Sequence, residues 1–127
     1  MLKTLRMLTL SASVVVVTAL VGLSTTTHAA DENKVSEEDI AKGKELAFDR
    51  GKGNCLACHM MDDGEMAGNI GPPLIAMKAR FPERETLHAQ IYDPRTKNPN
   101  TIMIPYGPHG VLSAEEINLI TDYVHTL

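Results

Sequence analysis

Apolar residues recur at three- and four-residue steps in two stretches of the chain, a spacing that puts them on one side of an α-helix. The first stretch follows Ser36, an N-cap residue with acidic residues after it. The second follows Ser113, which forms a capping-box pattern with Glu116. Their apolar positions are Ile40, Ala41, Gly43, Leu46 and Ala47, and then Ile117, Ile120, Tyr123, Val124 and Leu127.

A shorter helix is predicted from about Glu83 to Tyr92, with Pro82 allowed in its first turn. No stretch shows the alternation typical of a β-strand. The pattern therefore predicts an all-α domain. Gly43 is small enough to let another helix cross closely, so we expect a tight helix crossing there.

The first thirty residues have a different pattern. Lys3 and Arg6 precede an apolar run that ends in small residues around Ala29. This is the arrangement of a secretory signal peptide, and the run is short and interrupted for a membrane span. We expect residues 1–29 to be the signal, cleaved after Ala29 or Ala30, and residues 30–127 to form one exported domain free of the membrane.

The charge of that domain excludes some partners. Without Lys3 and Arg6, the 12 basic residues fall to 10 against 16 acidic ones, a net charge of about −6 with His neutral. No basic run is present, which argues against binding to nucleic acid. Three Tyr, two Phe and no Trp make a modest core, so we expect a bound group to complete the interior.

Both cysteines of the chain belong to one motif, Cys55-Leu56-Ala57-Cys58-His59. This is the pattern of covalent haem attachment: two thiols bond one porphyrin edge and the adjacent His ligates the iron. A disulfide, a thioredoxin-like pair and a zinc site are the alternatives. The adjacent His59, the lack of a preceding β-rich pattern and the lack of a second cysteine pair favour one haem c.

Two loops rich in Pro and Gly, residues 68–74 and 98–110, are expected to wall the haem. Met103 is our predicted second axial ligand, because it lies 44 residues after His59 on a stretch that prolines stiffen. His109 is the second choice. The remaining methionines of the domain are predicted to pack in the interior: Met60, Met61, Met66 and Met77. His88 and His125 fall in helical patterns.

The proximal histidine needs a partner for its other ring nitrogen, usually a backbone carbonyl. The turn at Gly71-Pro72-Pro73 suits this role, and the Pro72 carbonyl is the candidate for His59.

Several longer motifs resemble one family, the SoxX subunits of thiosulfate-oxidising SoxAX cytochrome complexes. The resemblance covers about residues 43–127 and includes the segment around the haem motif. Its other marks are Gly68-Asn69-Ile70-Gly71-Pro72-Pro73-Leu74, Arg80-Phe81-Pro82 and Asn98-Pro99-Asn100-Thr101. One departure is Ile104-Pro105-Tyr106-Gly107, where the family usually has Pro-Pro-Phe-Gly.

The resemblance implies a class I cytochrome c fold, with the N- and C-terminal helices crossing around one haem. It also implies that the distal ligand falls on Met103. The expected setting is the periplasm, in a heterodimer with a SoxA-like haem subunit that acts as an L-cysteine S-thiosulfotransferase. That enzyme class oxidatively conjugates thiosulfate to a cysteine of a SoxYZ-like carrier.

The number of cysteines indicates which part of that reaction this subunit could perform. Sulfur transfer needs a free thiolate, and Cys55 and Cys58 are both used by haem. We expect no catalytic residue here, only an electron outlet to a downstream acceptor. The alternative is a free periplasmic monohaem carrier. A haem sensor or peroxidase would need an open iron position, which Met103 ligation argues against.

Overall fold

The computed structural model describes residues 35–127. The predicted signal at residues 1–29 and the expected start of the domain at residue 30 lie outside the described residues. The elements in chain order are α1 (Glu37–Phe48), the 3-10 helix η1 (Cys55–Ala57), α2 (Met77–Arg80), α3 (Arg84–Tyr92), the 3-10 helix η2 (Pro94–Thr96) and α4 (Ala114–Thr126).

Capping boxes start both long helices; the sequence predicted the box at Ser113, and at Ser36 it predicted only an N-cap. The Ser36 side chain accepts from the Asp39 backbone N–H, and the Asp39 carboxylate accepts from the Ser36 N–H. Ser113 and Glu116 make the same pair at the start of α4. Each box satisfies backbone donors that the first helical turn leaves unpaired. The caps therefore fix where α1 and α4 begin.

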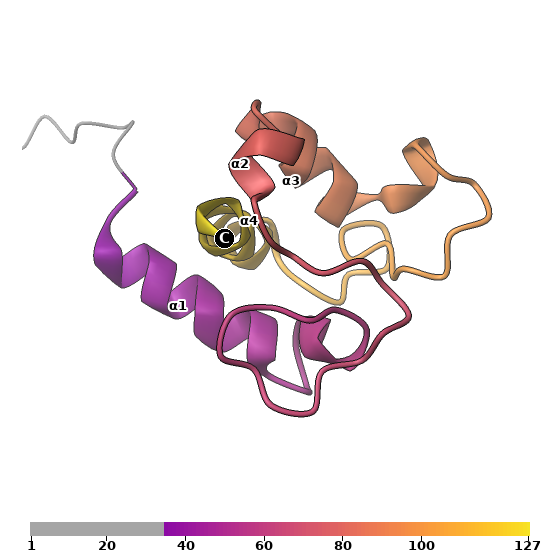
Figure 1. The fold of residues 1–127 in the computed structure, drawn as a ribbon. Helices are drawn as coiled ribbons and strands as arrows, with labels where there is room; N and C mark the ends of the chain where they lie inside the picture. The colour runs from indigo at the N-terminus through magenta and orange to yellow at the C-terminus, as the bar shows by residue number, and fades with distance from the viewer. Residues whose placement is uncertain (1–34) are drawn as a thin grey trace, which may run out of the picture. The chain divides into compact units, whose positions relative to one another are not determined.

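Helices α1 and α4 cross in close contact, with α4 seen nearly end-on in Figure 1. The approach is closest at Gly43, where an added Cβ would lie 2.0 Å from the Leu119 carbonyl oxygen. Next to it, the rings of Phe48 and Tyr123 meet edge to face, with centroids 6.4 Å apart. Gly43 is thus needed for the crossing, as predicted.

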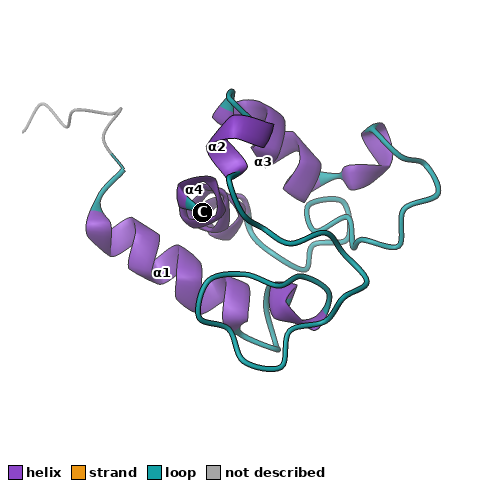
Figure 2. Ribbon diagram, viewed as in Figure 1, coloured by secondary structure: helices purple, strands orange, loops and turns teal. Residues whose placement is uncertain are grey.

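The other side of α4 is covered by α2 and α3 (Figure 2). The Arg84 guanidinium holds α3 there, donating to the Asp122 carboxylate at 2.5 Å and to the Asn118 carbonyl at 3.2 Å. No β-strand is present between residues 35 and 127, where one isolated bridge pairs Met61 with Leu74. The all-α prediction is confirmed. In the same part of the chain, no helix is long and apolar enough to cross a membrane.

The core lies where α4 meets the other helices, and two of the four methionines predicted to pack there do so. Met61 and Met77 are each 1 % exposed. The prediction is wrong for Met60, which is 51 % exposed, and for Met66, which is 89 % exposed. Met66 has a left-handed backbone, φ 54°, in an irregular loop, so no helical periodicity directs its side chain inward.

Candidate functional site

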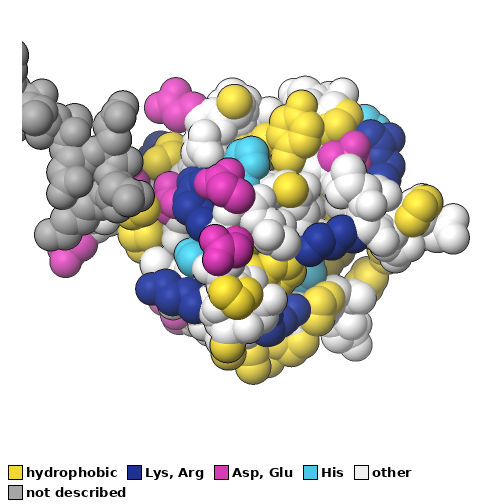
Figure 3. Space-filling view, turned by 90° about the horizontal axis from the view of Figure 1, so that it is seen from above, with side chains coloured by type: hydrophobic (Ala, Val, Ile, Leu, Met, Phe, Trp, Pro, Cys, Tyr) yellow, Lys and Arg dark blue, Asp and Glu magenta, His cyan; other side chains and the backbone are white. Residues whose placement is uncertain are grey.

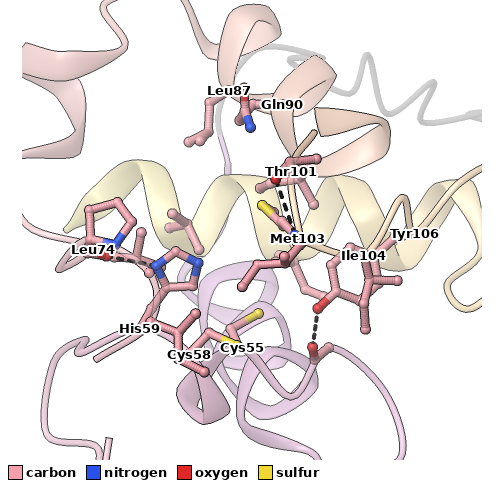
Figure 4. Close-up of a pocket in the computed structure, with 18 of the residues that line it drawn as sticks. Cys55, Cys58, His59, Leu74, Leu87, Gln90, Thr101, Met103, Ile104 and Tyr106 are labelled. Carbon is pink, nitrogen blue, oxygen red and sulfur yellow. Dashed lines mark hydrogen bonds between the residues drawn. The ribbon is translucent and has the colours of Figure 1, made fainter. Parts of the chain in front are cut away.

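A cavity of about 510 Å³ opens between the helices and the two loops rich in Pro and Gly. Its wall is largely apolar, with Leu74, Leu87 and Ile120 among the residues that line it. Cys55, Cys58, His59 and Met103 also line it, so the residues singled out from the sequence meet in one place (Figure 4).

The two cysteines enter the cavity from the short helix η1 and the residue after it. Asn54 precedes η1 in the left-handed conformation, φ 47°, and turns the chain sharply after α1. Cys55 and Cys58 are not joined to each other. Burial raises the pKa of the Cys55 thiol to about 11. An unreacted Cys55 is therefore held as the neutral thiol rather than as a reactive thiolate.

The His59 ring is held from one side. Its Nδ1 lies 2.7 Å from the Pro72 carbonyl oxygen, and because a carbonyl only accepts, Nδ1 carries the hydrogen. The ring also rests on Gly71, where an added Cβ would lie 2.3 Å from the imidazole Cε1. This leaves Nε2 as the ring nitrogen with a lone pair for a metal.

Met103 reaches the cavity from the loop between η2 and α4, on a different wall from His59 (Figure 4). Its backbone N–H donates to the Thr101 hydroxyl at 3.1 Å, which shapes the turn carrying the side chain. The buried Pro105 follows two residues later and limits the backbone there. The thioether is a soft, neutral donor suited to iron.

The three other histidines between residues 35 and 127 lie elsewhere. His109 is exposed, His88 stacks on Tyr92 with ring centroids 6.2 Å apart, and His125 Nε2 lies 2.9 Å from the Phe81 carbonyl oxygen. None of the three lines the cavity. The geometry thus favours Met103 over His109 as the residue opposite His59.

Arg80 and Tyr106 are among the lining residues that the sequence did not predict as part of the site. The Arg80 guanidinium donates to the Pro73 carbonyl at 2.7 Å, so it supports the turn that holds His59. The Tyr106 hydroxyl donates to the Gly53 carbonyl. Arg80 was noted only as part of a family motif, and Tyr106 only as a departure from one. Neither local sequence signals the carbonyl contact that the side chain makes.

The donor set suits one particular group. The two thiols, three residues apart, fit attachment to one edge of a porphyrin. The imidazole with its free Nε2 and the thioether on another wall fit ligation of the iron at the centre of that porphyrin. The apolar wall fits the flat face of the same group. The residues present therefore fit a covalently bound haem.

Comparisons with known proteins agree with a covalently bound haem. Residues 40–127 match the family model described as Cytochrome c. A protein of Aquifex aeolicus (strain VF5), described as an uncharacterized lipoprotein, is 40 % identical over 75 residues. The match covers 58 % of this chain and 36 % of the relative, so it spans about a third of that protein's length.

Proposed function

The chain belongs to the cytochrome c family, and from that premise we propose that Cys55 and Cys58 bind its haem c while His59 and Met103 ligate the iron. A c-type cytochrome with the all-α class I fold is an electron-transfer haem protein. The observation that carries the residue assignment is the convergence of all four side chains on one cavity. When bound, haem c supplies a site that gains or loses one electron.

The protein's own groups set what that site can do. The Pro72 carbonyl fixes the His59 ring and would make it a stronger donor to a haem iron. The Met103 thioether, as a ligand, would favour ferrous iron and raise the reduction potential. If His59 and Met103 both ligated the iron, no coordination position would be left for a substrate, so the residues support outer-sphere electron transfer.

We further propose that this cytochrome is the SoxX-like electron outlet of a periplasmic thiosulfate-oxidising heterodimer. The support is that the motifs of that resemblance, residues 68–74 and 98–101, contribute to the cavity wall. The partner would be a SoxA-like haem subunit, acting on a SoxYZ-like carrier. Because Cys55 and Cys58 are consumed by haem, the sulfur-transferring thiol lies on the partner.

An exported location is part of the proposal. The signal-like pattern of residues 1–29 and the description of the Aquifex aeolicus relative as a lipoprotein both support it. On the face seen in Figure 3, basic side chains are separated by acidic and apolar ones. Such a face offers no continuous positive field to a polyanion, so a protein partner is favoured over nucleic acid.

The ligand assignment is tested by Met103→Ala, with Met66→Ala as its matched control. We expect Met103→Ala to keep its haem attached but to open the iron, so that the reduced protein binds carbon monoxide. Met66 is 89 % exposed, and its replacement is expected to leave the absorption spectrum unchanged. A wild-type spectrum in Met103→Ala would reject Met103 as ligand.

The partner is tested separately, by pull-down of the tagged, exported protein from a host that contains its natural partners, followed by haem staining. A stoichiometric second haem protein supports the heterodimer. A lone haem band favours the alternative, a free periplasmic electron carrier. Thiosulfate conjugation by the purified single subunit would contradict the argument from the cysteines.

A further inference from the structure

The loop that carries Met103 is tied to the haem-attachment segment through one buried side chain. Tyr106 is 6 % exposed, lies three residues after Met103 and lines the cavity. Its hydroxyl donates to the carbonyl of Gly53, two residues before Cys55 (Figure 4). The bond joins two cavity walls that are 53 residues apart in sequence.

The acceptor of this bond is held rigidly. The Gly53 N–H donates to the Leu46 carbonyl at 3.1 Å, which fixes Gly53 against the end of α1. A Cβ at residue 53 would lie 2.8 Å from that same carbonyl oxygen and 3.2 Å from the Cys55 sulfur. The Tyr106 hydroxyl is therefore anchored to a fixed point beside the attachment site.

Apart from the cavity that they line, the residues on either side of Met103 have little apolar packing from the protein itself. Ile102 and Ile104, on either side of Met103, are 77 % and 44 % exposed. The hydrogen bond from the Met103 N–H goes to Thr101 within the same turn. Beyond Tyr106, the Gly107 N–H donates to the Tyr92 carbonyl at 3.0 Å and holds the far end of the loop on α3. Tyr106 thus lies between the secured end of the loop and the exposed end that carries Met103.

We propose that Tyr106 is a positioning residue for the iron ligand: its hydroxyl keeps the Met103 loop against the attachment segment and so keeps the thioether on the iron. This inference rests on the proposed ligation by Met103. The hydroxyl belongs to this chain in particular, because the family it resembles usually has Phe at that position. An outward movement of the loop that takes Met103 away from the iron also breaks the Tyr106 to Gly53 bond.

The test is the apparent affinity of the oxidised, haem-loaded protein for imidazole, which competes with Met103 for the iron. Tyr106→Phe keeps the ring and removes one hydrogen bond. We expect imidazole to bind about five-fold more tightly than to the wild type, which corresponds to about 1 kcal/mol, an ordinary net value for one hydrogen bond. Because Phe is usual there in the resembling family, the variant is expected to fold.

The matched control is Tyr123→Phe. Tyr123 is 2 % exposed, and its hydroxyl donates to the Asp62 carboxylate at 3.3 Å, but it does not line the cavity. Its replacement is expected to lower the free energy of unfolding while leaving imidazole affinity within two-fold of the wild type. This control separates a loss of ligand positioning from a general loss of stability.

Three results decide the matter when Met103→Ala is measured alongside. An unchanged imidazole affinity in Tyr106→Phe, with an open iron in Met103→Ala, overturns the role of Tyr106 and leaves the ligation intact. An equal gain in Tyr106→Phe and Tyr123→Phe also overturns it. A wild-type spectrum in Met103→Ala rejects the ligation on which the inference rests, and the inference with it.

Discussion

The α1 and α4 helix pair and the loops that wall the cavity are built in opposite ways. In the helix pair, apolar side chains bury one another: Ala47 and Ile117 are fully buried. In the loops, Ile70 and Ile102 are 64 % and 77 % exposed although both line the cavity. The helices complete their own core, whereas the loops present apolar surface that a bound haem covers.

The difference shows which interactions specify each region. Helices α1 and α4 follow from caps and periodicity, and their crossing depends on Gly43. The loops have no period and are held by single contacts to backbone carbonyls, such as those made by His59 and Tyr106. We therefore expect substitutions in the helix pair to change stability, and substitutions in the loops to change haem ligation.

The largest expected effect comes from removing the haem. In the double variant Cys55→Ser with Cys58→Ser, no thioether forms and the loop walls lose the surface that orders them. We expect the cooperative unfolding transition to disappear while part of the helical circular dichroism persists. The single variant Cys55→Ser, which keeps one attachment, is expected to be intermediate. A haem-free double variant that unfolds cooperatively at the wild-type midpoint would contradict the view that the loops depend on haem for their order.

The next effect is expected in the helix pair, from Gly43→Ala. The new methyl group would lie 2.0 Å from the Leu119 carbonyl oxygen, so α4 must shift away from α1. We expect a loss of about 3 kcal/mol in the free energy of unfolding, measured with guanidinium, and an unchanged haem spectrum. Gly51→Ala is the control, because an added Cβ there meets only the Asp49 side chain, at 3.3 Å. Equal losses in the two variants would contradict a close crossing.

A glycine-to-alanine substitution in a loop wall, Gly71→Ala, is expected to displace the His59 ring rather than a helix. Its methyl group would lie 2.3 Å from the His59 ring, so the imidazole must turn away from the Pro72 carbonyl. We expect an altered haem spectrum and reduction potential, with a smaller loss of stability than Gly43→Ala gives. Asn69→Ala, at an exposed neighbouring position, should leave both spectrum and potential unchanged. If Gly71→Ala lowered stability without changing the haem spectrum or the reduction potential, the loops and the helix pair would not differ in the way described.

The smallest effect is expected at the cap of α4. Lys52 bonds the Glu116 carboxylate at 2.6 Å and lowers its pKa below the ordinary value of 4.5, with help from the Ser113 N–H. A carboxylate with a lowered pKa stabilises the fold above its ordinary pKa and stops doing so as the pH falls through the lowered value. Glu116→Gln should therefore cost about 0.5 kcal/mol at neutral pH, since Lys52 is partly exposed.

Two controls test that interpretation. The stability difference between Glu116→Gln and the wild type should vanish in acid and shrink with added salt. Glu115→Gln removes a charge from the same helical turn without removing the bond to Lys52, so its effect should be smaller. A difference that persists in acid would point to packing rather than charge.

The sequence was a good guide where local rules act. The starts of α1 and α4, the helix at 84–92 and the close approach at Gly43 all follow from caps, spacing and residue size. Helix α2 has four residues, too few to show a period, and the Ala76 N–H before it bonds the distant Leu127 carbonyl. Tertiary contacts of that kind leave no local pattern.

The residues of the candidate site also fall into two groups, those that the sequence predicted and those that only the structure shows. Residue chemistry singled out Cys55, Cys58, His59 and Met103, and the structure brings them to one cavity. The supporting contact of Tyr106 joins segments 53 residues apart, and that of Arg80 joins the end of α2 to the turn seven residues before it. Residue spacing does not predict which carbonyl a side chain will contact, so the supporting roles of these two residues are seen only in the structure.

The spacing of the cavity residues also bears on the order of folding. Cys55, Cys58 and His59 lie within five residues, so haem can be captured by a short segment before the rest of the chain is organised. To ligate the same iron, as proposed, Met103 would have to close a loop of 44 residues, which carries a larger entropic cost and would be the slower event. We expect maturation to pass through a form with haem attached and only His59 bound, in which the haem nucleates the closing of the distal loop.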